Sequence, residues 1–161
     1  MTGPRAVGRR SRGRAWADEG TAVLEFLAVT VLLLVPVIYL VLVLGRLQAA
    51  TFAADSAARE AGRAFTTSAA VDDGARRAVA AVALALGDQG FDDVDPAAAL
   101  VLDCSDEPCL TAGGSVRVIV TFDVQLPAVP AFVQSVIPLA IPVSAEQVTP
   151  VPRFAPAGSR G

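Results

Sequence analysis

One uninterrupted apolar run near the N-terminus constrains the fold of this chain more than any other feature. Residues Thr21–Leu44 contain a single charged side chain, that of Glu25. As a helix, the run would extend about 36 Å at 1.5 Å per residue, which is enough to cross the hydrocarbon core of a bilayer. Pro36 lies inside the run, and a proline there kinks a membrane helix without ending it. The sequence therefore predicts a transmembrane helix over residues 21–44.

The charges on either side of the run predict its orientation. The preceding segment has five arginines and two acids, whereas the following segment has eight arginines and thirteen acids. Because basic flanks stay on the cytoplasmic side, we expect residues 1–20 to be a cytoplasmic leader and residues 45–151 to be an extracytoplasmic domain. Arg9-Arg10 also allows a nucleic-acid arm or a twin-arginine export signal. Residues 152–161, rich in proline and glycine, are predicted to be a disordered tail.

Glu25 needs a physical explanation, because ionisable groups are costly in a bilayer. On insertion scales an acidic residue at the centre of a transmembrane helix costs roughly 2.5–3.5 kcal/mol, and somewhat less near an end. Thr21 precedes Glu25 by four residues and would carry a free amine if the chain were cut after Gly20. Positions i and i+4 lie on one face of a helix. This amine, or that of a neighbouring subunit, would therefore neutralise Glu25.

Gly20, Glu25 and Phe26 together resemble the processing site of type IV prepilins, and more narrowly that of the tight-adherence (Flp/Tad) pilus system. In that family the leader ends in Gly, and the fifth mature residue is Glu followed by Tyr or Phe. The resemblance implies cleavage between Gly20 and Thr21 by a membrane-embedded prepilin peptidase. It departs from the wider type IV pattern at Thr21, where many pilins carry Phe.

The helix is predicted to continue beyond the membrane. Residues 47–65 contain no proline and are rich in alanine, the best helix former, so we expect one helix from Thr21 to about Phe65. Its outer half carries a small residue at every fourth position: Ala50, Ala54, Ala58 and Gly62. Such a stripe lets another backbone approach closely, although abundant alanine would produce the same pattern by coincidence.

The remaining pattern predicts an α+β fold. A second helix is expected to start at a cap on Thr67 or Ser68 and to end at Gly87, with the i,i+4 pairs Asp72–Arg76 and Asp73–Arg77. Residues 115–126 alternate strictly between apolar and polar side chains, which predicts a half-buried antiparallel strand. Residues 98–103 and 141–148 are its expected partners. A long N-terminal helix beside a small antiparallel sheet also resembles the pilin architecture.

Cys104 and Cys109 bracket the turn between the first two predicted strands. In an exported chain, two cysteines this close are expected to form a disulfide. A structural zinc site needs four Cys or His ligands, and the chain has two cysteines and no histidine. The acidic cluster at 88–95 allows calcium, but its spacing matches no known calcium-binding loop, and a solvated turn before Pro96 is expected instead. We therefore expect no metal or cofactor.

The uncharged segment 127–142 has prolines at 127, 130, 138 and 142, which forbid a straight helix. It is expected either to cover the open face of the sheet as a short helix or to form an exposed patch that docks a partner or the membrane.

No catalytic triad is possible without histidine, and no phosphate-binding loop appears, so we expect a structural protein and not an enzyme. The chain resembles the TadE-like minor pilins (pseudopilins). This implies a single-pass inner-membrane subunit whose partners are the prepilin peptidase, other pilins, assembly proteins and the lipid bilayer, with no nucleic acid or small-molecule substrate. Two alternatives remain: an uncleaved, membrane-anchored binding module, and a secreted domain cut near Ala49-Ala50.

Overall fold

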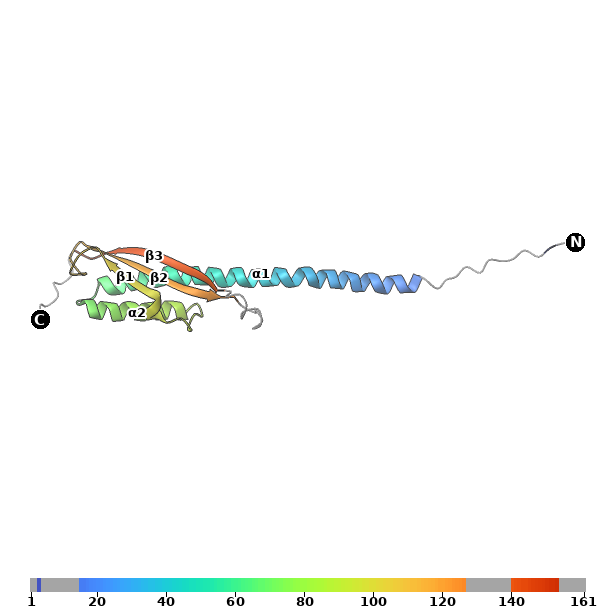
Figure 1. Ribbon diagram of the computed structural model, residues 1–161, viewed down its shortest axis with the longest axis horizontal. Helices are drawn as coiled ribbons and strands as arrows, with labels where there is room; N and C mark the ends of the chain where they lie inside the picture. Colours follow the sequence, from blue (N-terminus) through green and yellow to red (C-terminus); the bar gives the residue numbers. More distant parts are fainter. Residues whose placement is uncertain (1–2, 4–14, 127–139, 154–161) are drawn as a thin grey trace. The chain divides into compact units, whose positions relative to one another are not determined.

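The computed structural model describes residue 3 and residues 15–126 and 140–153. The chain forms two compact units, residues 1–41 and 42–161, each described by itself. The order of elements is α1 (Ala15–Thr66), α2 (Val71–Gly87), α3 (Pro96–Ala99), β1 (Leu100–Cys104), β2 (Ser115–Gln125) and β3 (Ala140–Pro150) (Figure 1). The predicted α+β class is therefore confirmed.

Helix α1 is 52 residues long and continues through Pro36. It begins six residues before the predicted start at Thr21, because residues 15–19 contain no glycine or proline. The side chains from Thr21 to Leu42 are exposed, and an 18-residue window of α1 reaches a mean hydropathy of 3.0. By length and composition, α1 is therefore able to cross a membrane.

The second unit, residues 42–161, is a two-layer domain in which α1 and α2 cover one face of the sheet (Figure 1). The sheet is antiparallel in the order β1-β2-β3. Its core side is dominated by alternate residues of β2, all buried: Val116, Val118, Val120, Phe122 and Val124. The alternation predicted for this strand is thus the pattern that faces the helices.

Alanine dominates the face of α1 that packs in this core. The buried apolar residues of α1 are Ala50, Ala53, Ala54, Ala57, Ala58, Ala61 and Phe65. Small side chains allow the helix backbone to lie close to the valines of β2, which fill the remaining space. Helix α2 adds Ala78, Val82 and Leu86 to the same cluster.

The turn between α1 and α2 differs from the sequence prediction. The hydroxyls of Thr67 and Ser68 do not cap α2; they donate to the α1 carbonyls of Arg63 and Ala64, both at 2.8 Å. Helix α2 starts three residues later, after Ala70, with no side-chain cap. The end of α1 has orphan carbonyls that need donors, and the two hydroxyls supply them.

Two further details of the prediction are wrong. Asp73 binds both Arg76, at 3.4 Å, and Arg77, at 2.8 Å, so Arg76 pairs with Asp73 and not with Asp72. The first strand begins at Leu100 because the preceding residues form α3, whose N-terminus is capped by Asp95 accepting from the Ala97 N–H at 2.9 Å.

Of the segment 127–142, residues 127–139 lie outside the described part of the chain and 140–142 belong to β3. Of the predicted tail, residues 154–161 also lie outside it.

Candidate functional site

The residues of the predicted processing site lie in one continuous stretch of α1. The peptide bond after Gly20 is inside the helix, five residues beyond its first residue, Ala15. Glu25 and Phe26 are exposed, Phe26 by 70%, and the Phe26 carbonyl accepts a hydrogen bond from the Thr30 hydroxyl at 2.7 Å.

The helical backbone at Gly20 bears on the predicted cleavage. A protease needs an extended backbone at the bond it cuts, so α1 would have to unwind locally around Gly20 before hydrolysis. Glycine in a helix interior is roughly 1 kcal/mol less favourable than alanine, which makes this point of α1 easier to open. Glycine at position 20 is therefore compatible with the predicted cleavage point.

The four small residues of the predicted packing stripe, Ala50, Ala54, Ala58 and Gly62, are all buried. A Cβ placed on Gly62 would overlap Thr149 Oγ1 of β3 and would lie 3.3 Å from Val118 Cγ2 of β2. All four residues are therefore buried in the core of the chain's own domain, with Gly62 against the sheet, and they are not free to pack against a second subunit.

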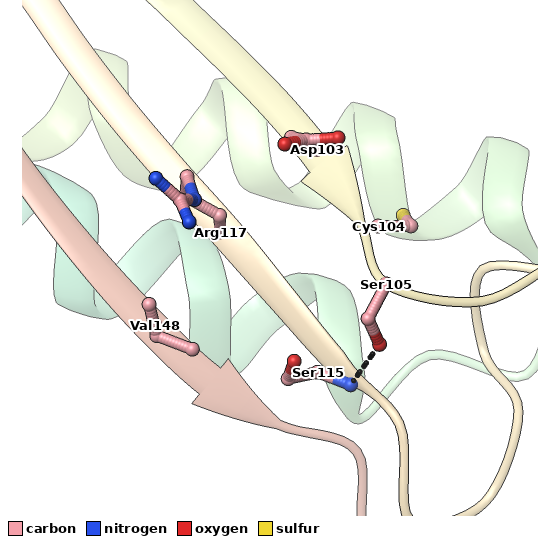
Figure 2. Close-up of a pocket in the computed structure, with 6 residues that line it drawn as sticks. All are labelled: Asp103, Cys104, Ser105, Ser115, Arg117 and Val148. Carbon is pink, nitrogen blue, oxygen red and sulfur yellow. Dashed lines mark hydrogen bonds between the residues drawn. The ribbon is translucent and has the colours of Figure 1, made fainter.

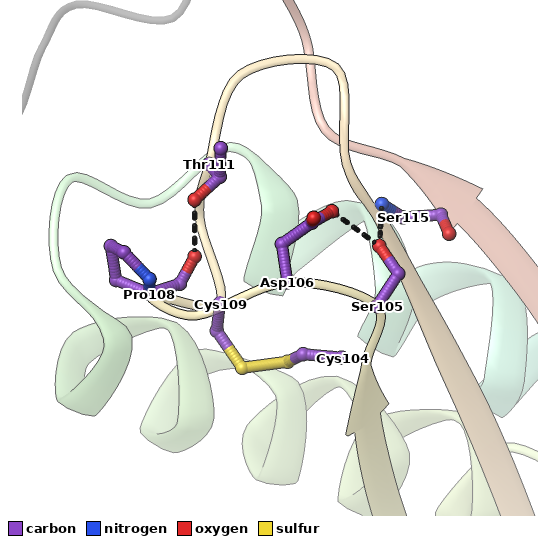
Figure 3. The surroundings of a disulfide bond; sticks show 7 residues. All are labelled: Cys104, Ser105, Asp106, Pro108, Cys109, Thr111 and Ser115. Atoms are coloured by element: carbon purple, nitrogen blue, oxygen red, sulfur yellow. Dashed lines mark hydrogen bonds between the residues drawn. A yellow bond between two sulfur atoms is a disulfide. The ribbon is translucent and has the colours of Figure 1, made fainter.

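Cys104 and Cys109 form a disulfide, with their Cα atoms 5.3 Å apart, as the sequence predicted (Figure 3). Both cysteines are half-buried against the core. The bond closes the turn that joins β1 to β2, and it is the covalent restraint on that turn.

Ser105 extends the β1–β2 ladder past the disulfide, which the sequence analysis did not foresee. Its N–H donates to the Ser115 carbonyl at 2.9 Å, and its hydroxyl accepts the Ser115 N–H at 2.9 Å. The same hydroxyl donates to Asp106 at 2.7 Å (Figure 3). The Ser105 hydroxyl therefore donates one hydrogen bond and accepts another within the turn, and it is poorly placed to act as a nucleophile.

A polar hollow of about 110 Å³ lies beside this turn on the sheet (Figure 2). Arg117, the one cationic residue in its lining, forms an ion pair with Glu146 at 3.0 Å. A second groove, of about 420 Å³, runs between α1 and α2 and includes Glu60, Leu84 and Asp88. Leu84 is 68% exposed there.

The border between the apolar run and the domain contains a contact that sequence reasoning missed. Arg46 stacks over the Phe91 ring, with its guanidinium carbon 3.9 Å from the ring centroid, and donates to the Gly90 carbonyl at 3.0 Å. Phe91 in turn packs on Phe122 at a centroid distance of 5.2 Å. Arg46 therefore joins α1 to the loop after α2. No local pattern predicts this contact, because the partners lie far apart in the sequence.

The acidic cluster at 88–95, considered above as a calcium site, includes a residue with a structural role. Asp95 is occupied as the cap of α3, and within residues 15–126 and 140–153 no group of three or more His, Cys, Asp or Glu side chains is placed to hold a metal ion. The calcium alternative has no support from this arrangement.

No protein-family model, curated protein or solved structure matches this chain. Its function must therefore be argued from the residues and geometry described above.

Proposed function

We propose that this chain is a TadE-like minor pilin, a structural subunit of a tight-adherence pilus that a prepilin peptidase processes after Gly20. The observation that carries the proposal is the continuity of α1. One helix contains the Gly20–Phe26 motif, then the exposed apolar run, and then the alanine face that supports a small α+β domain. A subunit that inserts a helix among other pilins needs these three parts in this order.

In the proposed mechanism α1 spans the inner membrane with the domain on the extracytoplasmic side. Cleavage exposes the amine of Thr21, and subunits associate through the apolar part of α1. Glu25 pairs with the amine of a neighbouring subunit, where the low dielectric makes the attraction stronger than at a water-exposed surface. The role of the domain is to be displayed or to contact other assembly proteins, and no catalytic step is required.

Replacing Glu25 by Gln tests this mechanism. The domain lies in a separate compact unit, so its folding should not change, and insertion should be unchanged or slightly easier because a costly charge is removed. Glu25→Gln should therefore be processed and membrane-resident but should no longer co-purify with other pilins. Glu107→Gln is the matched control, since Glu107 is an exposed glutamate in the turn between β1 and β2, outside the apolar run. If Glu25→Gln assembled as well as wild type, the charge-pairing role would be wrong.

The second candidate function is a membrane-anchored binding module that is neither cleaved nor assembled. The groove between α1 and α2, with the exposed Leu84 in its lining, favours it. The two functions differ in one observable, because only the pilin needs a new N-terminus at Thr21.

A further inference from the structure

Strand β3 runs alongside α1, so each residue of the strand lies beside a particular position along the helix axis. Near one end of β3, Ile141 lines a small apolar contact with Val43 and Leu47. Near the other end, Thr149 lies against Gly62. The distance from Val43 to Gly62 is about 28 Å along a helix, and that from Ile141 to Thr149 is about 26 Å along a strand. The near equality of these two lengths means that strand and helix are close to parallel (Figure 1).

The end of the domain at Val43 is apolar. Val43 and Leu44 are the last residues of the apolar run on α1, and Leu126 and Ile141 surround Val43 from the ends of β2 and β3. Leu44 is 49% exposed and Ala140 is also exposed. We call these five residues the apolar base. The sequence that joins Leu126 to Ala140 has no charged residue.

The loop after α2 lies at the same end of the domain and is acidic. The Arg46 side chain donates a hydrogen bond to the Gly90 carbonyl, and the neighbouring Asp88, Asp92 and Asp93 are exposed. Removing these carboxylates from water would be costly, so only the apolar base suits contact with lipid.

We infer that the apolar base rests in the headgroup and upper acyl layer of the membrane, so that the end of the sheet nearest Val43 lies at the bilayer surface. The inference depends on the proposed membrane span of α1. No linker separates the run from the domain, because Leu44 and Leu47 are one helical turn apart, about 4.5 Å. The headgroup layer on each side of a bilayer is thicker, about 5–7 Å. The apolar base is therefore at membrane level.

Tryptophan substitutions along β3 test this inference in the full chain. Ala140, Ser144 and Val148 are all exposed and project from the same face of the strand. Each would be replaced by Trp in turn, with Trp16→Phe removing the native indole. The proteins would be reconstituted in phosphatidylcholine vesicles with and without brominated acyl chains. Ala140→Trp should lose at least about half of its fluorescence to the brominated lipid, because its neighbours sit at membrane level. Ser144→Trp should lose little, and Val148→Trp, roughly 26 Å higher, should lose none.

Leu34→Trp, within the apolar run, separates the proposed membrane span of α1 from the proposed contact of the apolar base with lipid. If Leu34→Trp is quenched while Ala140→Trp behaves like Val148→Trp, the span stands and the base does not touch lipid. A blue-shifted but unquenched Ala140→Trp would mean that protein covers the base, which also overturns the inference. If Leu34→Trp is itself unquenched, the proposed span is wrong and the inference is wrong with it.

Discussion

The close approach of α1 to the sheet at Gly62 can be tested by adding a single methyl group. In Gly62→Ala the new Cβ would overlap Thr149 Oγ1 and would lie 3.2 Å from Thr149 Cβ and 3.3 Å from Val118 Cγ2. Rotating the Thr149 hydroxyl would relieve only the first of these contacts. Thr149, Val118 or the helix must therefore move by a few tenths of an ångström to accommodate the methyl group.

Two terms of opposite sign set the size of the effect. Overpacking a well-packed core costs typically about 1–3 kcal/mol, whereas replacing glycine by alanine inside a helix gains about 1 kcal/mol. Gly45→Ala is the matched control, because Gly45 lies on the same helix and a Cβ there would meet nothing within 4 Å. The helix-propensity term is common to both variants. The difference between them, about 1–3 kcal/mol, therefore measures the contact with the sheet.

Urea unfolding of the full chain in detergent, followed by resistance to a brief protease pulse, measures this difference. With a slope of about 2 kcal/mol per molar urea, the midpoint of Gly62→Ala should lie roughly 1 M below that of Gly45→Ala. Thr149→Ala should reduce the gap, because contacting residues are coupled. If Gly62→Ala were as stable as Gly45→Ala, the packing described for α1 on the sheet would be wrong.

Two further predictions concern the domain. Replacing both Cys104 and Cys109 by Ala should lower the free energy of unfolding by about 2 kcal/mol, as expected for so small a ring, and non-reducing peptide mapping of wild type should show the two linked, whereas free thiols would contradict the bond. Arg46→Lys should cost about 1 kcal/mol, because the planar guanidinium that stacks on Phe91 is lost. Arg59→Lys, whose partner Asp55 is on the surface, should leave the urea midpoint unchanged, and equal midpoints for the two variants would refute the role of Arg46.

Local patterns predicted most of this fold. The strict alternation of β2 specifies a strand with one buried face. The continuity of α1 follows from an alanine-rich segment that no proline interrupts after residue 36. In each case the determining interactions are between residues close in sequence, so the pattern is visible without the structure.

Contacts between distant residues were not predictable in the same way. The partner of Gly62 is Thr149, and that of Arg46 is Phe91. The first residue of β1 depended on whether Asp95 would cap a short helix, a local competition that β propensity alone does not decide. The predicted packing stripe illustrates the limit best, because sequence spacing indicates that something packs on it but not whether the partner belongs to the same chain.

The N-terminus of the protein in its own membrane tests the proposed function most directly. Intact-mass analysis and N-terminal sequencing of membrane-extracted protein should find a chain that starts at Thr21. Gly20→Leu should abolish this cleavage, and Gly13→Leu, in the same leader, should not. A wild-type chain that retains residues 1–20 would contradict the pilin proposal and favour the anchored module, and one that starts near Thr51 would indicate a secreted domain.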